Sequence, residues 1–209
     1  MPARLRLTLV VVAVCALAAL AGVVALGGRG DGGEAAGDAI PTGLHGALRP
    51  AGLRAPDFRL RDQHRRLATM RAYRGRLVIV TFMYSTCRDT CPLTAQQIRG
   101  ALDDLGHDVP VLAISVDPVG DTPANVRRFL AEQRMARRMR YLTGTAAQLA
   151  PVWRAYGVQP ETSGSEHTAS TVIVDGGGLQ RVGYLTDQLT PEGLSADLRA
   201  LSDGARVLR

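Results

Sequence analysis

Two cysteines, Cys87 and Cys91, stand four positions apart at the end of an apolar run. The run 77–84 has the composition and length of a buried strand, and Pro92 directly after the second cysteine is typical of a helix start. A turn between a strand and a helix places both sulfurs near the N–H groups of the helix N-terminus, which favour a thiolate over a thiol. Because the thiolate is the form of cysteine that binds metals and attacks disulfides, we interpret this segment as a reactive dithiol.

The dithiol has two mutually exclusive fates, a metal site or a disulfide. Residues i and i+4 share a helix face, so both sulfurs can point at one ion, and a turn can also bring the two α-carbons within disulfide range. A purely structural disulfide is the weaker interpretation, because closing so short a loop removes little chain entropy. The third cysteine, Cys15, lies in an apolar N-terminal run, so Cys87 and Cys91 form the only pair in the part expected to fold.

His167 is the third candidate for this site. It follows a polar loop and immediately precedes the β-rich run 168–174. In an α/β sheet the loops at strand ends gather along one rim, so a histidine there can approach a dithiol that is distant in sequence. An ordinary exposed loop histidine is the alternative.

Strand and helix patterns alternate along the part that should fold. We expect an edge strand within 55–63, strands at 77–84, 110–116 and 140–142, a hairpin of 168–174 and 179–185, and helices at 92–105, 123–135, 145–156 and 191–201. Asp121 and Thr122 before Pro123 should cap the second helix, and Pro151 should break the third. This order predicts an α/β fold, a three-layer sandwich around a mixed sheet.

Residues 7–26 carry no charge over twenty positions, enough to cross a bilayer as a helix. Two arginines precede the run and three acidic residues follow it, which predicts a cytoplasmic N-terminus and an extracytoplasmic domain. A cleaved signal peptide is the alternative, but its apolar region is usually only about 7–15 residues long. We therefore expect a single-pass anchor in the cell membrane (1–26), a flexible tether (27–50) and a folded domain (51–209).

The net charge of +6 does not point to nucleic acid. All 25 basic residues are arginine, and the chain contains no lysine. Selection for phosphate binding rarely excludes lysine, which also binds phosphate well, so a general composition bias explains the high arginine content better. We expect no nucleic-acid partner.

The stretch T-F-M-Y-S-T-C-R-D-T-C-P (81–92) resembles the signature of the Sco/SenC family of membrane-tethered copper chaperones. Further blocks in family order lie at 55–63, 114–123, 141–144, 152–158 and 166–175. The resemblance implies a thioredoxin-like fold with Cys87, Cys91 and His167 as copper ligands. It also implies delivery of copper to the binuclear copper site of cytochrome c oxidase subunit II. Such a carrier, rather than an enzyme, would require an upstream copper donor and a thiol reductant.

The chemistry of the three side chains agrees with this resemblance. Two thiolates and one imidazole suit Cu(I) and tolerate Cu(II), whereas a structural zinc site usually takes four ligands. Asp89 and Asp117 are candidate neighbours that could tune the thiolates, although both could equally be turn or cap residues. Arg88, Glu166 and Gly176 depart from the usual family residues without removing a ligand.

Two enzyme classes remain as alternatives. An extracytoplasmic thiol-disulfide oxidoreductase would use the same cysteines, but such reductases typically have C-x-x-C and a cis-proline where this chain has His167 and Thr168. A peroxide-reducing enzyme should have Thr or Ser three positions before its reactive cysteine, where Tyr84 and Arg88 stand. We favour copper delivery, and reduction of the recipient's cysteines by the same dithiol is compatible with it.

Overall fold

The computed structural model describes residues 42–160 and 170–207. The predicted anchor and His167 lie outside these ranges. The domain belongs to a compact unit that extends from Ala39 to Arg209. Among the residues described, no helix has both the length and the apolar character that a membrane span needs.

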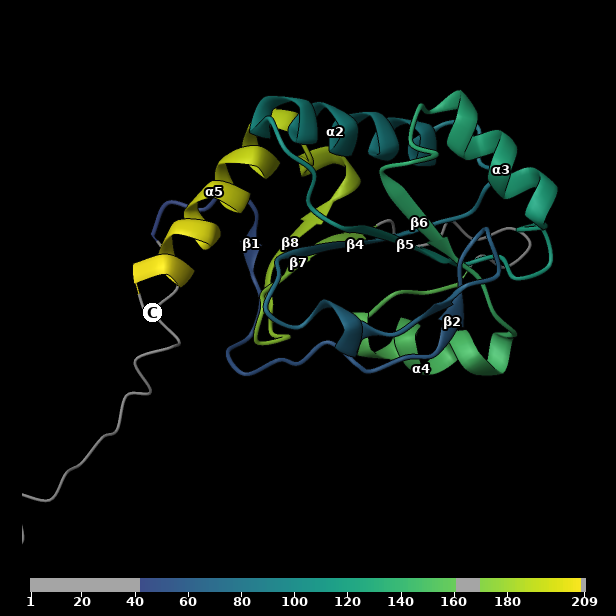
Figure 1. Cartoon of the computed structure of the whole chain (residues 1–209), viewed down its shortest axis with the longest axis horizontal. Helices are drawn as coiled ribbons and strands as arrows, with labels where there is room; N and C mark the ends of the chain where they lie inside the picture. The colour runs from purple at the N-terminus through teal and green to yellow at the C-terminus, as the bar shows by residue number, and fades with distance from the viewer. Residues whose placement is uncertain (1–41, 161–169, 208–209) are drawn as a thin grey trace, which may run out of the picture. The chain divides into compact units, whose positions relative to one another are not determined.

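Six strands form one mixed sheet, which lies at the centre of the domain in Figure 1. In spatial order they are β1 (Ala47–Leu48), β8 (Gln180–Leu185), β7 (Ser170–Val174), β4 (Val78–Met83), β5 (Val111–Ser115) and β6 (Met139–Leu142). Strands β4, β5 and β6 run parallel, whereas β7 and β8 form an antiparallel hairpin against β4. Two short strands, β2 (Leu60–Arg61) and β3 (Leu67–Ala68), pair separately. The predicted mixed sheet is confirmed.

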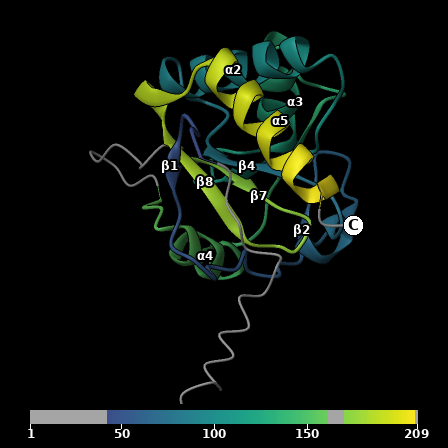
Figure 2. The ribbon, with the colours of Figure 1, turned by 90° about the vertical axis from the view of Figure 1, so that its left-hand side faces the viewer.

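Helices cover both faces of this sheet, as Figures 1 and 2 show. Three lie on one face, α2 (Thr90–Leu105), α3 (Pro123–Glu132) and α5 (Pro191–Val207), and α4 (Ala146–Tyr156) lies on the other. Short 3₁₀ helices, η1 (Met70–Tyr73) and η2 (Thr186–Gln188), occupy two of the connections. The predicted three layers are therefore present.

Strand β4 explains why two separate cores form. All six of its residues are buried, and successive side chains point to opposite faces of the sheet. Ile79 and Met83 belong to the core under α2, α3 and α5, whereas Val80 and Phe82 belong to the core above α4. A central strand with apolar side chains on both faces must be covered on both.

Helix α4 differs from its prediction, because it continues through Pro151 without a break. Proline removes one backbone hydrogen bond from a helix. A capping box between Thr145 and Gln148 stabilises the start of α4, and Trp153 and Tyr156 anchor its far end in the core. We attribute the continuous helix to this cap and this packing, which together outweigh one missing bond.

Strand β1 brings part of the predicted tether into the fold. It pairs with β8, and the residues just before it are held by a buried carboxylate of α5. The backbone N–H groups of His45 and Gly46 donate to Asp197, at 2.8 and 3.1 Å, and the Tyr184 hydroxyl donates to the same carboxylate. Ordered structure therefore starts upstream of residue 51, within the range 27–50.

The opposite edge of the sheet is covered by a side chain. The Gln63 amide accepts the backbone N–H of Tyr141 at 3.0 Å and donates to the carbonyl of Met139 at 3.1 Å. Arg61 and Thr143 exchange two backbone hydrogen bonds immediately beyond. The amide of Gln63 thus takes the place that a neighbouring strand would occupy along β6.

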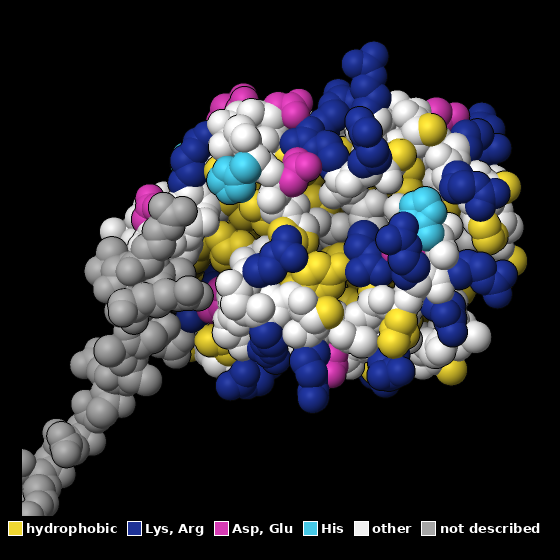
Figure 3. All heavy atoms as spheres, in the orientation of Figure 1, with side chains coloured by type: hydrophobic (Ala, Val, Ile, Leu, Met, Phe, Trp, Pro, Cys, Tyr) yellow, Lys and Arg dark blue, Asp and Glu magenta, His cyan; other side chains and the backbone are white. Residues whose placement is uncertain are grey.

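Arginine side chains are spread over the face drawn in Figure 3, in several separate groups. Two of the arginines near β6 form ion pairs within the domain. Arg138 contacts Asp103 and Asp108, at 2.5 and 2.7 Å, and Arg140 contacts Asp62 at 2.8 Å. Part of the positive charge near β6 is therefore balanced locally.

Candidate metal and redox site

The dithiol lies where β4 leaves the sheet. Beyond Met83, the backbone N–H of Cys87 donates to the carbonyl of Tyr84 at 3.2 Å, which closes a turn. Helix α2 then begins at Thr90, two residues earlier than predicted, with Asp89 as its N-cap. Cys91 lies in the first helical turn and Cys87 precedes the helix. The turn, rather than a shared helix face, brings the two sulfurs together, which corrects the i, i+4 argument.

Several donors converge on the sulfur of Cys87. The backbone N–H of Cys91 donates to it with an N to S distance of 3.3 Å, and the Thr90 hydroxyl lies 3.6 Å away. The hydrogen bond from the Cys91 thiol lowers the pKa of Cys87 most; with the N–H groups of Asp89 and Cys91 and the Thr90 hydroxyl it outweighs the effect of burial and brings that pKa to about 5. Cys87 is therefore a thiolate at neutral pH.

Cys91 has the opposite character. It is only 2% exposed, and its thiol donates toward the Cys87 sulfur. That hydrogen bond and the burial together raise the pKa of Cys91 well above its usual value. Both cysteines are free in this structure. The pair therefore consists of a thiolate at Cys87 and a thiol at Cys91, and the thiol donates a hydrogen bond to the thiolate.

The two predicted carboxylate neighbours have different surroundings. Asp89 Oδ1 lies 3.5 Å from the Cys87 sulfur, so this residue is both a cap and a neighbour of the dithiol. Its negative charge disfavours the thiolate, but it is exposed and solvent screens it. Asp117 Oδ1 accepts the N–H groups of Val119 and Gly120, as expected of a turn residue.

Asp121 is the residue that the sequence analysis misassigned. Thr122 alone caps α3, since its hydroxyl accepts the N–H of Asn125. The Asp121 carboxylate turns inward and is 5% exposed; it accepts the backbone N–H of Ser85 at 2.6 Å, and it lies 2.9 Å from the Tyr141 hydroxyl. Burial raises the pKa of Asp121 above its usual value, more than the accepted hydrogen bonds lower it. Pro123 gave a signal, because it fixes Thr122 as the N-cap and leaves Asp121 without that role.

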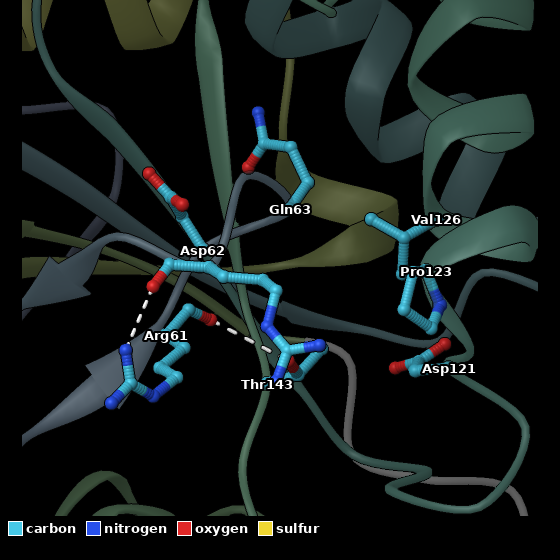
Figure 4. A pocket seen from close by; sticks show the side chains of 8 residues that line it. Arg61, Asp62, Gln63, Asp121, Pro123, Val126 and Thr143 are labelled. Atoms are coloured by element: carbon cyan, nitrogen blue, oxygen red, sulfur yellow. Dashed lines mark hydrogen bonds between the residues drawn. The ribbon is translucent and has the colours of Figure 1, made fainter.

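Asp121 also lines a pocket of about 190 Å³, drawn in Figure 4. Asp121, Pro123 and Val126 stand on one side of it, and Arg61, Asp62 and Gln63 stand on the other. Neither cysteine is among the lining residues. The pocket therefore does not lead to the dithiol.

His167 cannot be placed against the two sulfurs, because it lies outside the described residues. The start of β7 can be placed, since the Thr81 hydroxyl of β4 donates to the carbonyl of Ser170 at 3.4 Å. Within 42–160 and 170–207, no group of three or more His, Cys, Asp or Glu side chains is arranged to hold a metal ion. The three-ligand set stays a prediction.

The layered sheet and the dithiol at the strand-to-helix turn define a thioredoxin-like domain. The chain belongs to the SCO1/SenC family, whose family model matches residues 47–203. It is 33% identical over 156 residues to the mitochondrial SCO2 homolog of Bos taurus, a match that covers 72% of this chain and 55% of that protein. The chain therefore spans about half the length of this relative.

Two further relatives bear on the chemistry. The copper-bound structure of Bradyrhizobium japonicum ScoI is 28% identical, with a TM-score of 0.57 over 71% of this chain and 99% of that one. Alkyl hydroperoxide reductase E of Mycobacterium tuberculosis is 31% identical over 138 residues, which is 62% of this chain and 81% of that protein. The second match shows that one relative of this chain is named as an alkyl hydroperoxide reductase.

Proposed function

We propose that this protein is a copper carrier that holds Cu(I) or Cu(II) on Cys87, Cys91 and His167. It would deliver the ion to the binuclear copper site of cytochrome c oxidase subunit II. The observation that carries the proposal is the sulfur pair at the N-terminus of α2, where the backbone N–H of Cys91 donates to the Cys87 sulfur and the pKa of Cys87 is lowered to about 5. Soft thiolate ligands select Cu(I).

The start of β7 supports His167 as the third ligand. Strand β7 runs antiparallel to β4, so it begins at the edge of the sheet where β4 ends and the dithiol turn starts. His167 precedes Ser170 by three residues, which limits their separation to roughly 10 Å. An imidazole on so short a connection is within reach of the same edge. The copper-bound relative of 28% identity supports the same cargo.

The proposal also names the protein that receives the copper, the source of the copper and the location of the domain. The family of the chain and the resemblance of its motifs favour cytochrome c oxidase assembly, with an upstream copper donor and a thiol reductant that keeps the pair reduced. The uncharged run 7–26 favours a membrane anchor, with the N-terminus in the cytoplasm and the domain outside the cell membrane.

A thiol-disulfide oxidoreductase is the second candidate, and one observation favours it. A cysteine whose pKa is lowered to about 5 attacks disulfides readily at neutral pH. The peroxidase reading is weaker, because Tyr84 stands three positions before Cys87, where that class should carry a hydroxyl of Thr or Ser.

The experiment that tests the proposal is a Cu(I) titration of the full-length chain in detergent, with a competing chelator, for the wild type and for His167→Ala. We expect the affinity of His167→Ala to fall by about a hundredfold or more, as for loss of a metal ligand. His107→Ala is the matched control, because His107 is exposed and lies outside the site.

Disulfide reductase activity is measured on the same three proteins. If the copper affinity of His167→Ala is unchanged and the proteins reduce disulfides rapidly, the copper-carrier proposal must be replaced by the thiol-disulfide oxidoreductase. Equal losses in His167→Ala and His107→Ala would remove His167 from the ligand set.

A further inference from the structure

We propose that Asp121 is a positioning residue for the dithiol, and that its carboxyl group fixes the turn 84–87 so that Cys87 and Cys91 can close on one ion. The inference rests on the proposed function, because copper is the ion considered. It concerns a residue that touches neither sulfur. Asp121 lies thirty or more positions after the cysteines, in the connection between β5 and α3.

The first contact of Asp121 is with the turn itself. Its Oδ1 accepts the backbone N–H of Ser85 at 2.6 Å, and Ser85 is two residues before Cys87. Both ends of this hydrogen bond are buried, since Ser85 is 6% and Asp121 is 5% exposed. Loss of this buried hydrogen bond would leave the Ser85 N–H group without a partner, which costs more free energy than an average hydrogen bond contributes.

The second contact reaches the strand that delivers the turn. The Tyr141 hydroxyl lies 2.9 Å from Asp121 Oδ2 and 3.0 Å from the carbonyl oxygen of Met83, the last residue of β4. Tyr141 is fully buried. Asp121 is therefore connected to the turn at Ser85 directly and to the end of β4 through Tyr141.

The donors and acceptors around Asp121 indicate which of these groups carry a proton. Tyr141 has one hydroxyl proton, and the Met83 carbonyl can only accept. If that proton goes to Met83, the contact between Tyr141 and Asp121 needs a proton on Asp121, and burial favours the protonated form of this carboxyl. An asparagine can satisfy the same two partners, because its oxygen accepts from the Ser85 N–H and its NH₂ group donates to the Tyr141 hydroxyl.

The consequence for the dithiol is preorganisation. Cys87 is the last residue of the turn, and its sulfur must stay beside Cys91 for both to bind one ion. Without the carboxyl group the turn would be free to move, and an incoming ion would have to order it at the expense of binding free energy. The same freedom would lower the effective concentration of one sulfur at the other and so disfavour the disulfide.

The test compares Asp121→Ala, Asp121→Asn and Asp197→Ala in the full-length chain in detergent. Asp197 is the matched control, because it too is a buried carboxylate that accepts backbone N–H groups and a tyrosine hydroxyl, but at the β1 edge. Two quantities are measured for each protein: Cu(I) affinity against a chelator, and the equilibrium of the Cys87–Cys91 disulfide with dithiothreitol. In the second measurement the disulfide takes two electrons and two protons from the reductant, which becomes a cyclic disulfide.

We expect Asp121→Ala to bind Cu(I) about tenfold more weakly and its disulfide to be about tenfold easier to reduce, the effect of one lost hydrogen bond of this kind. Asp121→Asn should restore both quantities to within about threefold of the wild type. Asp197→Ala should lower the melting temperature without changing either quantity by more than about twofold, because Asp197 accepts from His45, Gly46 and Tyr184 and not from the turn 84–87.

Equal effects of Asp121→Ala and Asp197→Ala on the dithiol would overturn the inference, since they would reflect general loss of stability. Asp121→Asn behaving like Asp121→Ala would overturn it as well, because the hydrogen-bond geometry would then not be what matters. If the wild type failed to bind Cu(I) while the disulfide equilibria shifted as expected, the copper proposal would fail and the positioning role would stand.

Discussion

Two buried carboxylates hold two very different parts of this domain. Asp121 and Asp197 are 5% and 1% exposed, and each accepts backbone N–H from a loop and contacts a buried tyrosine. Asp197 fastens the residues before β1, a two-residue strand at the edge of the sheet. Asp121 fastens the turn that carries Cys87, whose pKa is lowered to about 5.

Asp197 and Asp121 make similar hydrogen bonds, but one holds an edge of the sheet and the other holds the dithiol turn. The same kind of contact therefore serves stability in one region and the candidate site in the other. Asp197 accepts two N–H groups of the chain, at His45 and Gly46, whereas Asp121 accepts one, at Ser85. We therefore expect the larger loss of folding free energy at Asp197 and the larger loss of dithiol function at Asp121.

The largest effect should follow from removal of a sulfur. Cys91→Ala should weaken Cu(I) binding by more than about a hundredfold, because one thiolate and one imidazole are a poor site for this ion. Chelator competition measures it. Cys15→Ala is the matched control, and comparable losses in the two variants would mean that the dithiol is not the copper site.

Asp197→Ala should destabilise the domain by about 2–4 kcal/mol, because two part-buried backbone N–H groups lose their carboxylate acceptor. Tyr184 keeps a partner, since its hydroxyl also lies 3.2 Å from the carbonyl of Gly193. Urea unfolding at fixed pH measures the change. A loss below about 0.5 kcal/mol would show that water replaces the carboxylate, and the two regions would then not be comparable.

Proton release should reveal the asymmetry of the dithiol. At pH 7 Cys87 has already lost its proton, since its pKa is about 5, whereas Cys91 retains its own because its pKa is raised. Both must be thiolates to bind Cu(I), so we expect about one proton released per ion at pH 7 and a larger number below pH 5. Calorimetry in two buffers with different ionisation enthalpies counts the protons. A value near two at pH 7 would mean that Cys87 is a thiol.

The smallest effect should come from Asp89→Asn. Its carboxylate disfavours the Cys87 thiolate but is exposed, so removing the charge should lower the pH midpoint of Cys87 alkylation by roughly half a unit or less. The rate of iodoacetamide modification against pH measures the midpoint, with Asp187→Asn as a matched exposed acid. A midpoint that rises instead would mean that Asp89 acts on the thiolate mainly as the cap of α2.

Much of the central sheet could be predicted from the sequence. Strands β4 and β5 lie within the predicted ranges 77–84 and 110–116. Short continuous apolar runs bounded by turn residues are typical of buried strands, which is why both could be predicted. Strand β1 gave no signal, since two exposed residues have no periodicity and form a strand only because β8 and Asp197 are there. Likewise, packing overrode the local preference of Pro151.

Part of the candidate site could also be predicted from the sequence. Cysteine spacing and the strand-to-helix pattern placed Cys87 and Cys91 at one turn, and the structure confirms it. The role of Asp121 was not predictable, because Pro123 indicates Thr122 as the cap but only the fold shows where the Asp121 side chain then points. The position of His167 relative to the sulfurs and the membrane anchor stay predictions.

The amide of Gln63 has a consequence for self-association. An open edge strand can template the backbone of another molecule, which is the first step of strand addition and of amyloid growth. By engaging the backbone at Met139 and Tyr141, Gln63 removes two of the groups that a foreign strand would need. Gln63 also accepts the backbone N–H of Tyr141, whose hydroxyl contacts Asp121, so the residue that covers this edge is joined by hydrogen bonds to the residue that holds the turn 84–87.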